Sequence, residues 1–188
     1  MRKASCWRYR ERMWWCSGPS ENFALTTGSE AWRTRAATKK AMSVRHATKD
    51  DLEQVLEIEE LTFSDPWGYY NFQAALEDIF LVFAEQEIYG FLVAVCCHRD
   101  TRGAIVKVGV HPEHRRQGIA TRLLETALRT LQNKGMLDVC LIVEITRQQA
   151  IQLYKKLGFK ITKIINMSYE DDMSDDSFYE MKLNFSPN

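Results

Sequence analysis

The spacing of hydrophobic residues from residue 42 onward switches repeatedly between the periods expected of helices and of strands. In residues 119–131 hydrophobic side chains recur every three or four positions, which predicts an amphipathic helix that buries one face. The same spacing in residues 52–61, 71–76 and 148–157 predicts three further helices. Gly135 lies just beyond the helix of residues 119–131, where a left-handed glycine commonly ends a helix.

Runs rich in β-branched and aromatic residues separate these helices and predict strands. The expected strands cover residues 43–47, 80–84, 88–97, 104–110, 139–145, 159–167 and 177–183. The resulting order is strand, two helices, three strands, helix, strand, helix and two strands. This order predicts an α/β (α+β) domain, with a mixed central sheet of about seven strands and helices on both faces.

Residues 1–41 lack this periodicity and differ from the remainder in charge. They contain nine Lys/Arg and three Asp/Glu, a net charge of +6, whereas residues 42–188 contain sixteen and twenty-two, a net charge of −6. Three interpretations stay open: a disordered extension, a basic arm that binds a partner, or an upstream start codon with Met42 as the true first residue. We expect disorder or a misassigned start, and one domain over residues 42–186. Binding of nucleic acid is not expected.

Composition is that of a globular domain, with 45% hydrophobic and 27% charged residues. No apolar run approaches the ~20 residues of a membrane span, so no membrane association is expected. The five cysteines show no zinc-type spacing, and no metal is expected. Cys96, Cys97 and Cys140 fall in apolar strand-like runs and are expected to be reduced core thiols, which indicates a cytoplasmic protein.

The segment of residues 108–120 is the first with recognisable chemistry. A β-branched strand enters a basic turn that contains Arg115, Arg116 and Gly118, and the turn opens directly into a helix. The first N–H groups of a helix have no internal partner and lie at the positive end of its dipole, so such a turn can bind a phosphate. An ordinary strand-to-helix connection with surface arginines is the alternative.

Two motifs resemble those of the GNAT N-acetyltransferases. Arg115-x-x-Gly118-x-Ala120 is similar to the family's Arg/Gln-x-x-Gly-x-Gly/Ala loop, and residues 150–159 (AIQLYKKLGF) are similar to its Ala-x-x-Leu-Tyr-x-Lys-x-Gly-Phe helix. The predicted order of elements is also that of the GNAT fold. Residues 63–67 (FSDPW) and the tail from residue 167 to 178 resemble the branch that acetylates protein N-termini, which includes the ribosomal-protein-alanine acetyltransferases.

The resemblance implies that acetyl-CoA is the co-substrate. Backbone groups of Val108 and Val110 would contact its pantetheine arm and thioester carbonyl. The loop residues whose N–H groups would hold the pyrophosphate are Arg115, Arg116, Gln117, Gly118, Ile119 and Ala120. Arg147, at the family's Asn position, either adds a contact to the cofactor or is a solvated arginine at a helix start. His111 and His114 flank the loop and are expected to be surface residues, with a catalytic role as the alternative.

Acetyl transfer to an amine needs a neutral amine, a stabilised oxyanion and a proton for the leaving thiolate. Tyr154 is the candidate acid, because a phenol with a pKa near ~10 keeps its proton at neutral pH; the alternative is a core aromatic. Ile142 occupies the position of the family's catalytic Glu. Glu144 lies two residues later on the same strand face, displaced by roughly 7 Å, and is either the base or a structural carboxylate.

The sequence signals for the acceptor site are less specific than those for the cofactor site. By resemblance, Phe63, Pro66, Trp67 and Tyr169 would shape the entrance for a peptide, although simple packing would also explain them. The acidic run of residues 170–176 either attracts an amine or is a solvated turn. We predict an acetyl-CoA-dependent N-acetyltransferase whose acceptor is the N-terminal α-amine of a protein. The alternatives are a GNAT enzyme that acetylates a small amine or polyamine, and a non-catalytic module that binds acyl-CoA.

Overall fold

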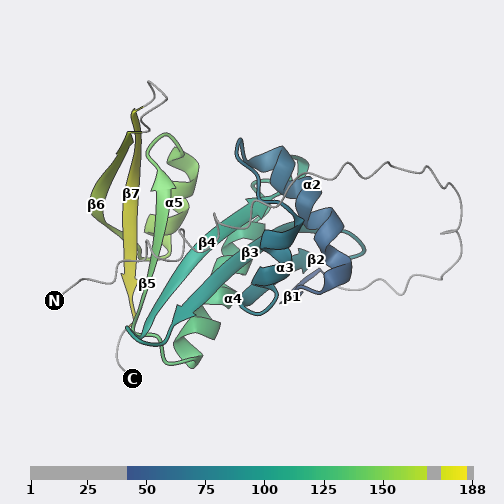
Figure 1. Ribbon diagram of the computed structural model, residues 1–188, viewed down its shortest axis with the longest axis horizontal. Helices are drawn as coiled ribbons and strands as arrows, with labels where there is room; N and C mark the ends of the chain where they lie inside the picture. Colours follow the sequence, from purple (N-terminus) through teal and green to yellow (C-terminus); the bar gives the residue numbers. More distant parts are fainter. Residues whose placement is uncertain (1–41, 169–174, 186–188) are drawn as a thin grey trace, which may run out of the picture.

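A mixed sheet forms the centre of the domain in the computed structural model, which describes residues 42–168 and 175–185 (Figure 1). The seven strands of this described part are β1 (Ser43–His46), β2 (Ile79–Ala84), β3 (Ile88–Cys97), β4 (Arg102–Val110), β5 (Asp138–Glu144), β6 (Lys160–Ser168) and β7 (Asp175–Asn184). Their spatial order is β1-β2-β3-β4-β5-β7-β6. Neighbouring strands are antiparallel except for β4 and β5, which are parallel.

Helices cover both faces of the sheet, so the predicted fold class is confirmed. They are α2 (Leu52–Thr62), α3 (Tyr69–Ala75), α4 (Ile119–Asn133) and α5 (Gln148–Lys156). Two short 3₁₀ turns, η1 (Lys49–Asp51) and η2 (Pro112–His114), precede α2 and α4 and were not predicted. The helices α2 and α3 pack on one face, whereas α4 and α5 share the hydrophobic cluster on the opposite face (Figure 1).

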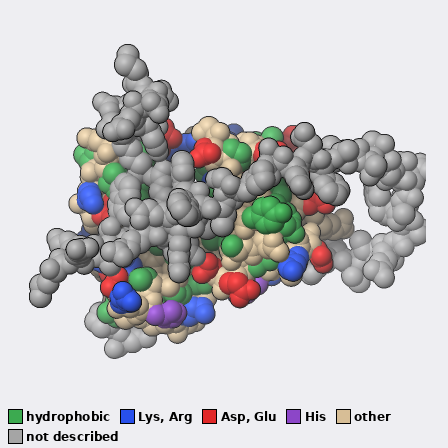
Figure 2. Space-filling view, viewed as in Figure 1, with side chains coloured by type: hydrophobic (Ala, Val, Ile, Leu, Met, Phe, Trp, Pro, Cys, Tyr) green, Lys and Arg blue, Asp and Glu red, His purple; other side chains and the backbone are tan. Residues whose placement is uncertain are grey.

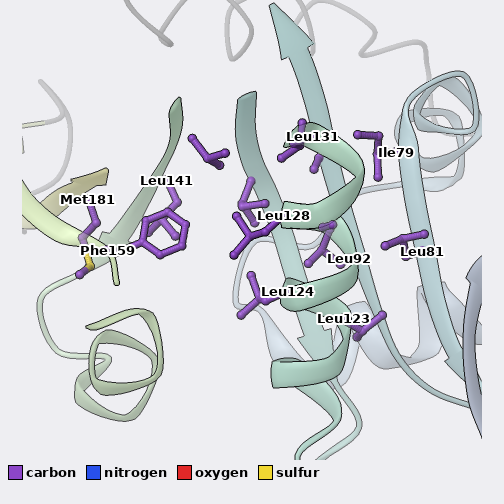
Figure 3. Packing of buried hydrophobic residues seen from close by; sticks show 14 of the residues in the cluster. Ile79, Leu81, Leu92, Leu123, Leu124, Leu128, Leu131, Leu141, Phe159 and Met181 are labelled. Carbon is purple, nitrogen blue, oxygen red and sulfur yellow. The ribbon is translucent and has the colours of Figure 1, made fainter. Parts of the chain in front are cut away.

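The larger cluster holds α4 against the sheet (Figure 3). Leu123, Leu124 and Leu131 are completely buried, which confirms the helical face predicted from their spacing. Gly103 of β4 lies under this helix, where an added Cβ would come within 2.9 Å of the Leu131 side chain. Because α4 is packed along its length, the turn that precedes it is held at the end of β4.

The second cluster joins α2 and α3 to the other face. Phe72 of α3 packs against Phe80 and Phe91, with ring centroids 5.7 Å and 5.4 Å away. Gly109 of β4 lies beneath Phe91, and a Cβ at this position would overlap the phenyl ring. The aromatic cluster therefore extends to the part of β4 that the sequence links to the cofactor.

A buried carboxylate joins β1 to the start of α2. Asp51 accepts hydrogen bonds from both terminal nitrogens of Arg45, at 2.6 and 2.7 Å, and from the backbone N–H of Thr48 at 2.7 Å. The hydrogen bonds from Arg45 lower the pKa of Asp51, and burial opposes them. Thr48 and Asp51 also form a capping box.

Replacement of this carboxylate tests its contribution to stability. We expect Asp51→Asn to lower the free energy of unfolding at pH 7 by about 2 kcal/mol, since charge-assisted hydrogen bonds of a buried group are lost. The lowered pKa of Asp51 means that its stabilisation is present above the unfolded-state pKa of ~3.9 and is lost as the pH falls through the lower folded-state pKa. Urea titrations at pH 7 and in acid, with the exposed neighbour Asp50→Asn as control, measure both effects. An equal loss at both pH values would contradict the assignment.

The structure corrects one prediction made from the sequence. Other predictions concern residues outside the described ranges. Cys140 is buried as predicted and Cys96 is half-buried, but Cys97 is exposed, because it is the last residue of β3 at the turn to β4. No helix in the described ranges is long and apolar enough to cross a membrane. The predictions for residues 1–41, for Tyr169 and for most of the acidic run of residues 170–176 lie outside the described part of the chain.

Candidate active site

The sheet opens between β4 and β5. The two strands pair only between residues 102–104 of β4 and 138–140 of β5, and then diverge (Figure 1). The remaining part of β4, including Val108 and Val110, has no strand partner on its β5-facing edge among the described residues. Backbone groups on such an edge are free to pair with an extended ligand. The divergence thus leaves an unpaired strand edge at the two positions that the family resemblance links to the pantetheine arm.

A β-bulge determines which side chains of β4 point to which face. The register between β3 and β4 shifts so that Val93 pairs with Lys107 and Ala94 pairs with Ile105, which leaves Val106 as the extra residue. Val108 packs against the cluster on the α4 side, whereas Lys107 contacts α2. Without the bulge, the alternation of side chains would place Lys107 on the α4 side.

The turn between β4 and α4 has a backbone conformation that can present N–H groups to an anion. Gly118 has a φ of +79° and Arg116 a φ of +62°, so two residues of the turn are left-handed. The Nε of Arg115 donates to the carbonyl of Val110 at 3.3 Å, which ties the turn back to β4. Arg116, Gln117 and Gly118 are exposed, and the N–H groups of the first turn of α4 lie directly behind them.

The two histidines beside this turn pack on neighbouring rings and stay partly exposed. His114 stacks on Tyr89 with ring centroids 4.2 Å apart and lies 5.5 Å from the ring of His111. The backbone N–H of Glu113 donates to Nδ1 of His111 at 3.3 Å. The two histidines are half-buried supports of the turn, because the η2 turn folds them back onto β3.

Tyr154 lies on the same face of the sheet as the side chains of Val108 and Val110. It packs on the hydrophobic cluster that also contacts Val108 and Val110, and its ring centroid is 5.9 Å from that of Phe159. Burial raises the pKa of Tyr154 to about 12. The phenol therefore keeps its proton throughout the neutral and mildly alkaline range, and it can act there as a hydrogen-bond donor.

Glu144 ends β5 on the opposite face. Val139, Leu141 and Val143 point to the α4 side, so the alternation places Ile142 and Glu144 on the α2 side.

The side chain of Glu144 is held locally at the start of α5. Its carboxylate accepts hydrogen bonds from the hydroxyl of Thr146 and, at 3.3 Å, from Nε of Arg147. Arg147, predicted to contact the cofactor, is half-exposed and paired with Glu144 in this structure. The two residues thus form one polar unit beside the divergence of the strands.

The residues predicted to line the acceptor entrance lie between α2 and α3. Phe63 and Trp67 are half-buried, and Trp67 packs on Phe72 with ring centroids 5.3 Å apart, while Pro66 is exposed. Figure 2 shows exposed hydrophobic side chains over α3, which agrees with the exposure of Tyr69 and Tyr70. Tyr169 lies outside the described residues.

A buried ion pair that the sequence reasoning missed lies beneath this entrance. Glu59 of α2 is completely buried and accepts hydrogen bonds from the ammonium group of Lys107 and from the backbone N–H of Trp67, at 2.8 Å for the latter. Burial raises the pKa of Glu59, although the bonds from Lys107 and Trp67 oppose this. The available signal was a pair of opposite charges at buried positions of apolar patterns, Glu59 in helical register with Val55 and Lys107 within a β-branched strand.

Comparison with known proteins agrees with this arrangement. The model of the acetyltransferase (GNAT) family matches residues 49–159, which include α2, the open strand β4, the turn and Tyr154. The chain belongs to the GNAT acetyltransferase family. This GNAT enzyme is 28% identical over 144 residues to an N-alpha-acetyltransferase of Saccharolobus solfataricus, covering 69% of this chain and 86% of the relative.

Solved structures show the same fold. The ribosomal-protein-S18-alanine N-acetyltransferase of Escherichia coli superposes with a TM-score of 0.69 at 22% identity, covering 79% of this chain and 96% of the other. Arabidopsis thaliana Naa50, solved in complex with the bisubstrate analogue CoA-Ac-MVNAL, superposes with a TM-score of 0.67 at 22% identity, covering 77% and 99%. The resemblance to the GNAT fold and to its N-terminal acetyltransferase branch is thus confirmed.

Proposed function

We propose that this GNAT enzyme transfers an acetyl group from acetyl-CoA to the N-terminal α-amine of a protein, by direct attack in a ternary complex. The observation that carries the proposal is the open edge of β4. It runs from the anion-binding turn of α4 toward the aromatic loop of Phe63 and Trp67, so that donor and acceptor can meet at one strand. The names of relatives that acetylate α-amines support the choice of acceptor. Free thiols at Cys96, Cys97 and Cys140 support a reducing, cytoplasmic location.

The residues present fit acetyl-CoA, which supplies an acetyl group activated as a thioester. The first-turn N–H groups of α4 and the exposed residues 116–118 would hold the pyrophosphate, with Arg115 bracing the turn. Backbone groups of Val108 and Val110 would bind the pantetheine arm along the open edge and orient the thioester carbonyl. Arg147 would approach the cofactor only by exchanging its contact with Glu144.

Glu144 is the base in this proposal. It lies on the α2 side, the same side as Phe63 and Trp67, and its partners Thr146 and Arg147 hold it at the end of β5. A carboxylate acting through a water molecule can remove the proton of an attacking amine. The requirement is modest, because an α-amine with a pKa near ~8 is already partly neutral at pH 7, whereas a lysine side chain near ~10.4 is not. Ile142 in place of the family's Glu is therefore more compatible with an N-terminal acceptor.

Tyr154 is the donor to the leaving thiolate. With its pKa raised to about 12 by burial, the phenol is a weaker acid than a thiol near ~8.5, so complete proton transfer from Tyr154 alone is uphill. We assign it a hydrogen bond to the developing thiolate. The proton that finally resides on the thiol then originates from the attacking amine, which balances the reaction.

The choice of acceptor can be tested with acetylation kinetics. We expect the GNAT enzyme to acetylate short peptides with a free α-amine at a kcat/KM at least about a hundredfold above that for spermidine or for the same peptides blocked at the N-terminus but containing lysine. Release of CoA thiol and mass spectrometry of the peptide measure both reactions. Turnover of polyamines with only background activity on peptides would contradict the N-terminal assignment and support the small-amine alternative.

A further inference from the structure

We propose that Lys107 is a specificity-determining residue of the acceptor site, which favours acidic or neutral side chains over basic ones next to the reacting amine. The inference rests on the proposed function, since it concerns the peptide that would enter beside Phe63 and Trp67.

The side chain of Lys107 lies against the two aromatic residues of the predicted entrance. The bulge at Val106 turns Lys107 toward α2, while the next residue, Val108, belongs to the edge assigned to the cofactor. Its ammonium group lies 3.9 Å from the ring centroid of Phe63 and 5.3 Å from that of Trp67. Lys107 therefore connects the donor strand to both aromatic residues of the entrance.

The two partners of the ion pair are buried to different depths. The side chain of Glu59 is 0% exposed, whereas that of Lys107 is 12% exposed, so the carboxylate lies behind the ammonium. One carboxylate oxygen, Oε1, binds both Lys107 and Trp67, and the buried Oε2 has no hydrogen-bond partner among the described residues. An incoming peptide would meet the cationic end of the pair, and the anionic end stays within the protein.

The charge of Lys107 is expected to determine which peptide side chains the enzyme prefers. The faces of Phe63 and Trp67 attract cations, but Lys107 already occupies this place, so a lysine or arginine of the peptide would meet a like charge instead of an open aromatic site. Asp65 on the same loop is exposed, so solvent screens its charge more strongly than that of Lys107. At a half-buried site, one favourable or unfavourable charge pair is expected to change relative kcat/KM by about tenfold.

The inference can be tested with peptides that differ only in carrying Glu, Gln or Lys at the first or second residue. For the wild type we expect kcat/KM to be about tenfold higher with Glu than with Lys, mostly through KM. In Lys107→Met this ratio should fall toward one. In Glu59→Gln, which keeps an acceptor for Trp67 and removes the anion behind Lys107, the ratio should rise, and a merely structural role of the pair would not produce this rise.

Removal of one partner from a buried ion pair can prevent folding. The double variant Lys107→Met/Glu59→Gln has a neutral pair of similar size, and circular dichroism and CoA binding report whether it is intact. It should also lose the preference for Glu. A wild-type ratio in a folded Lys107→Met or double variant would overturn the inference and leave the proposed function standing. Absence of turnover with every peptide would overturn both.

Discussion

Replacement of Tyr154 by phenylalanine is expected to lower kcat by about a hundredfold and to leave the affinity for CoA within about twofold of the wild type. The phenyl ring can keep the packing of Tyr154 on Phe159 and on the α4-side cluster, so the structural change is confined to the hydroxyl group. The loss should appear in kcat because, in the proposed mechanism, the hydroxyl acts only as the thiolate forms. Stopped-flow detection of CoA thiol and calorimetric titration with CoA separate the two quantities.

A matched control is available on β7. Tyr179 is also half-buried against the α4-side cluster, and Tyr179→Phe should change kcat by less than about threefold.

The pH dependence of the rate adds a second check on the role of Tyr154. Because the pKa of Tyr154 is about 12, its titration should cause no loss of activity between pH 7 and 10, and the rate should rise as the α-amine loses its proton near ~8. An unchanged kcat in Tyr154→Phe would remove this residue from the mechanism.

Substitution of Gly118 by alanine should weaken CoA binding by about thirtyfold, which is about 2 kcal/mol, because the added Cβ would lie where the backbone must approach the pyrophosphate. Nothing lies within 4 Å of this Cβ in the structure, so the substitution causes no clash within the protein itself. Its φ of +79° nevertheless adds backbone strain of roughly 1 kcal/mol, which would lower stability without any effect on the ligand site.

Substitution of Gly135 separates the effect on stability from the effect on CoA binding. It has a φ of +80° and equally open surroundings, but it lies beyond the opposite end of α4. Gly118→Ala and Gly135→Ala should therefore lose similar amounts of stability in thermal unfolding, whereas only Gly118→Ala should lose affinity for CoA in calorimetry. Equal CoA affinities of the two variants would show that the α4 turn does not hold the pyrophosphate.

The sequence motifs identified features whose residues are neighbours in the chain. The turn of residues 115–120 depends on one strand end, one helix start and Gly118, so its geometry follows from local conformational preferences. The four helices were recognisable because each buries one continuous face. The packing of His111 and His114 on Tyr89 was harder to predict, because it depends on the path of η2 across β3.

Other features depend on residues far apart in the chain. Glu59 and Lys107 are separated by 48 positions, and their pairing requires both α2 packing on the sheet and the bulge that turns Lys107 over. The raised pKa values of Glu59 and Tyr154 arise from burial that only packing creates.

For this protein, the sequence by itself determined the element order, the GNAT motifs and the glycine-containing turn before α4, because periodicity and turn chemistry act over a few residues. Tertiary structure alone decided how far β4 and β5 pair, where Cys97 lies, and which partner of the Glu59–Lys107 ion pair is more deeply buried. These depend on the register between strands and on packing across the sheet, where a shift of one residue exchanges the two faces.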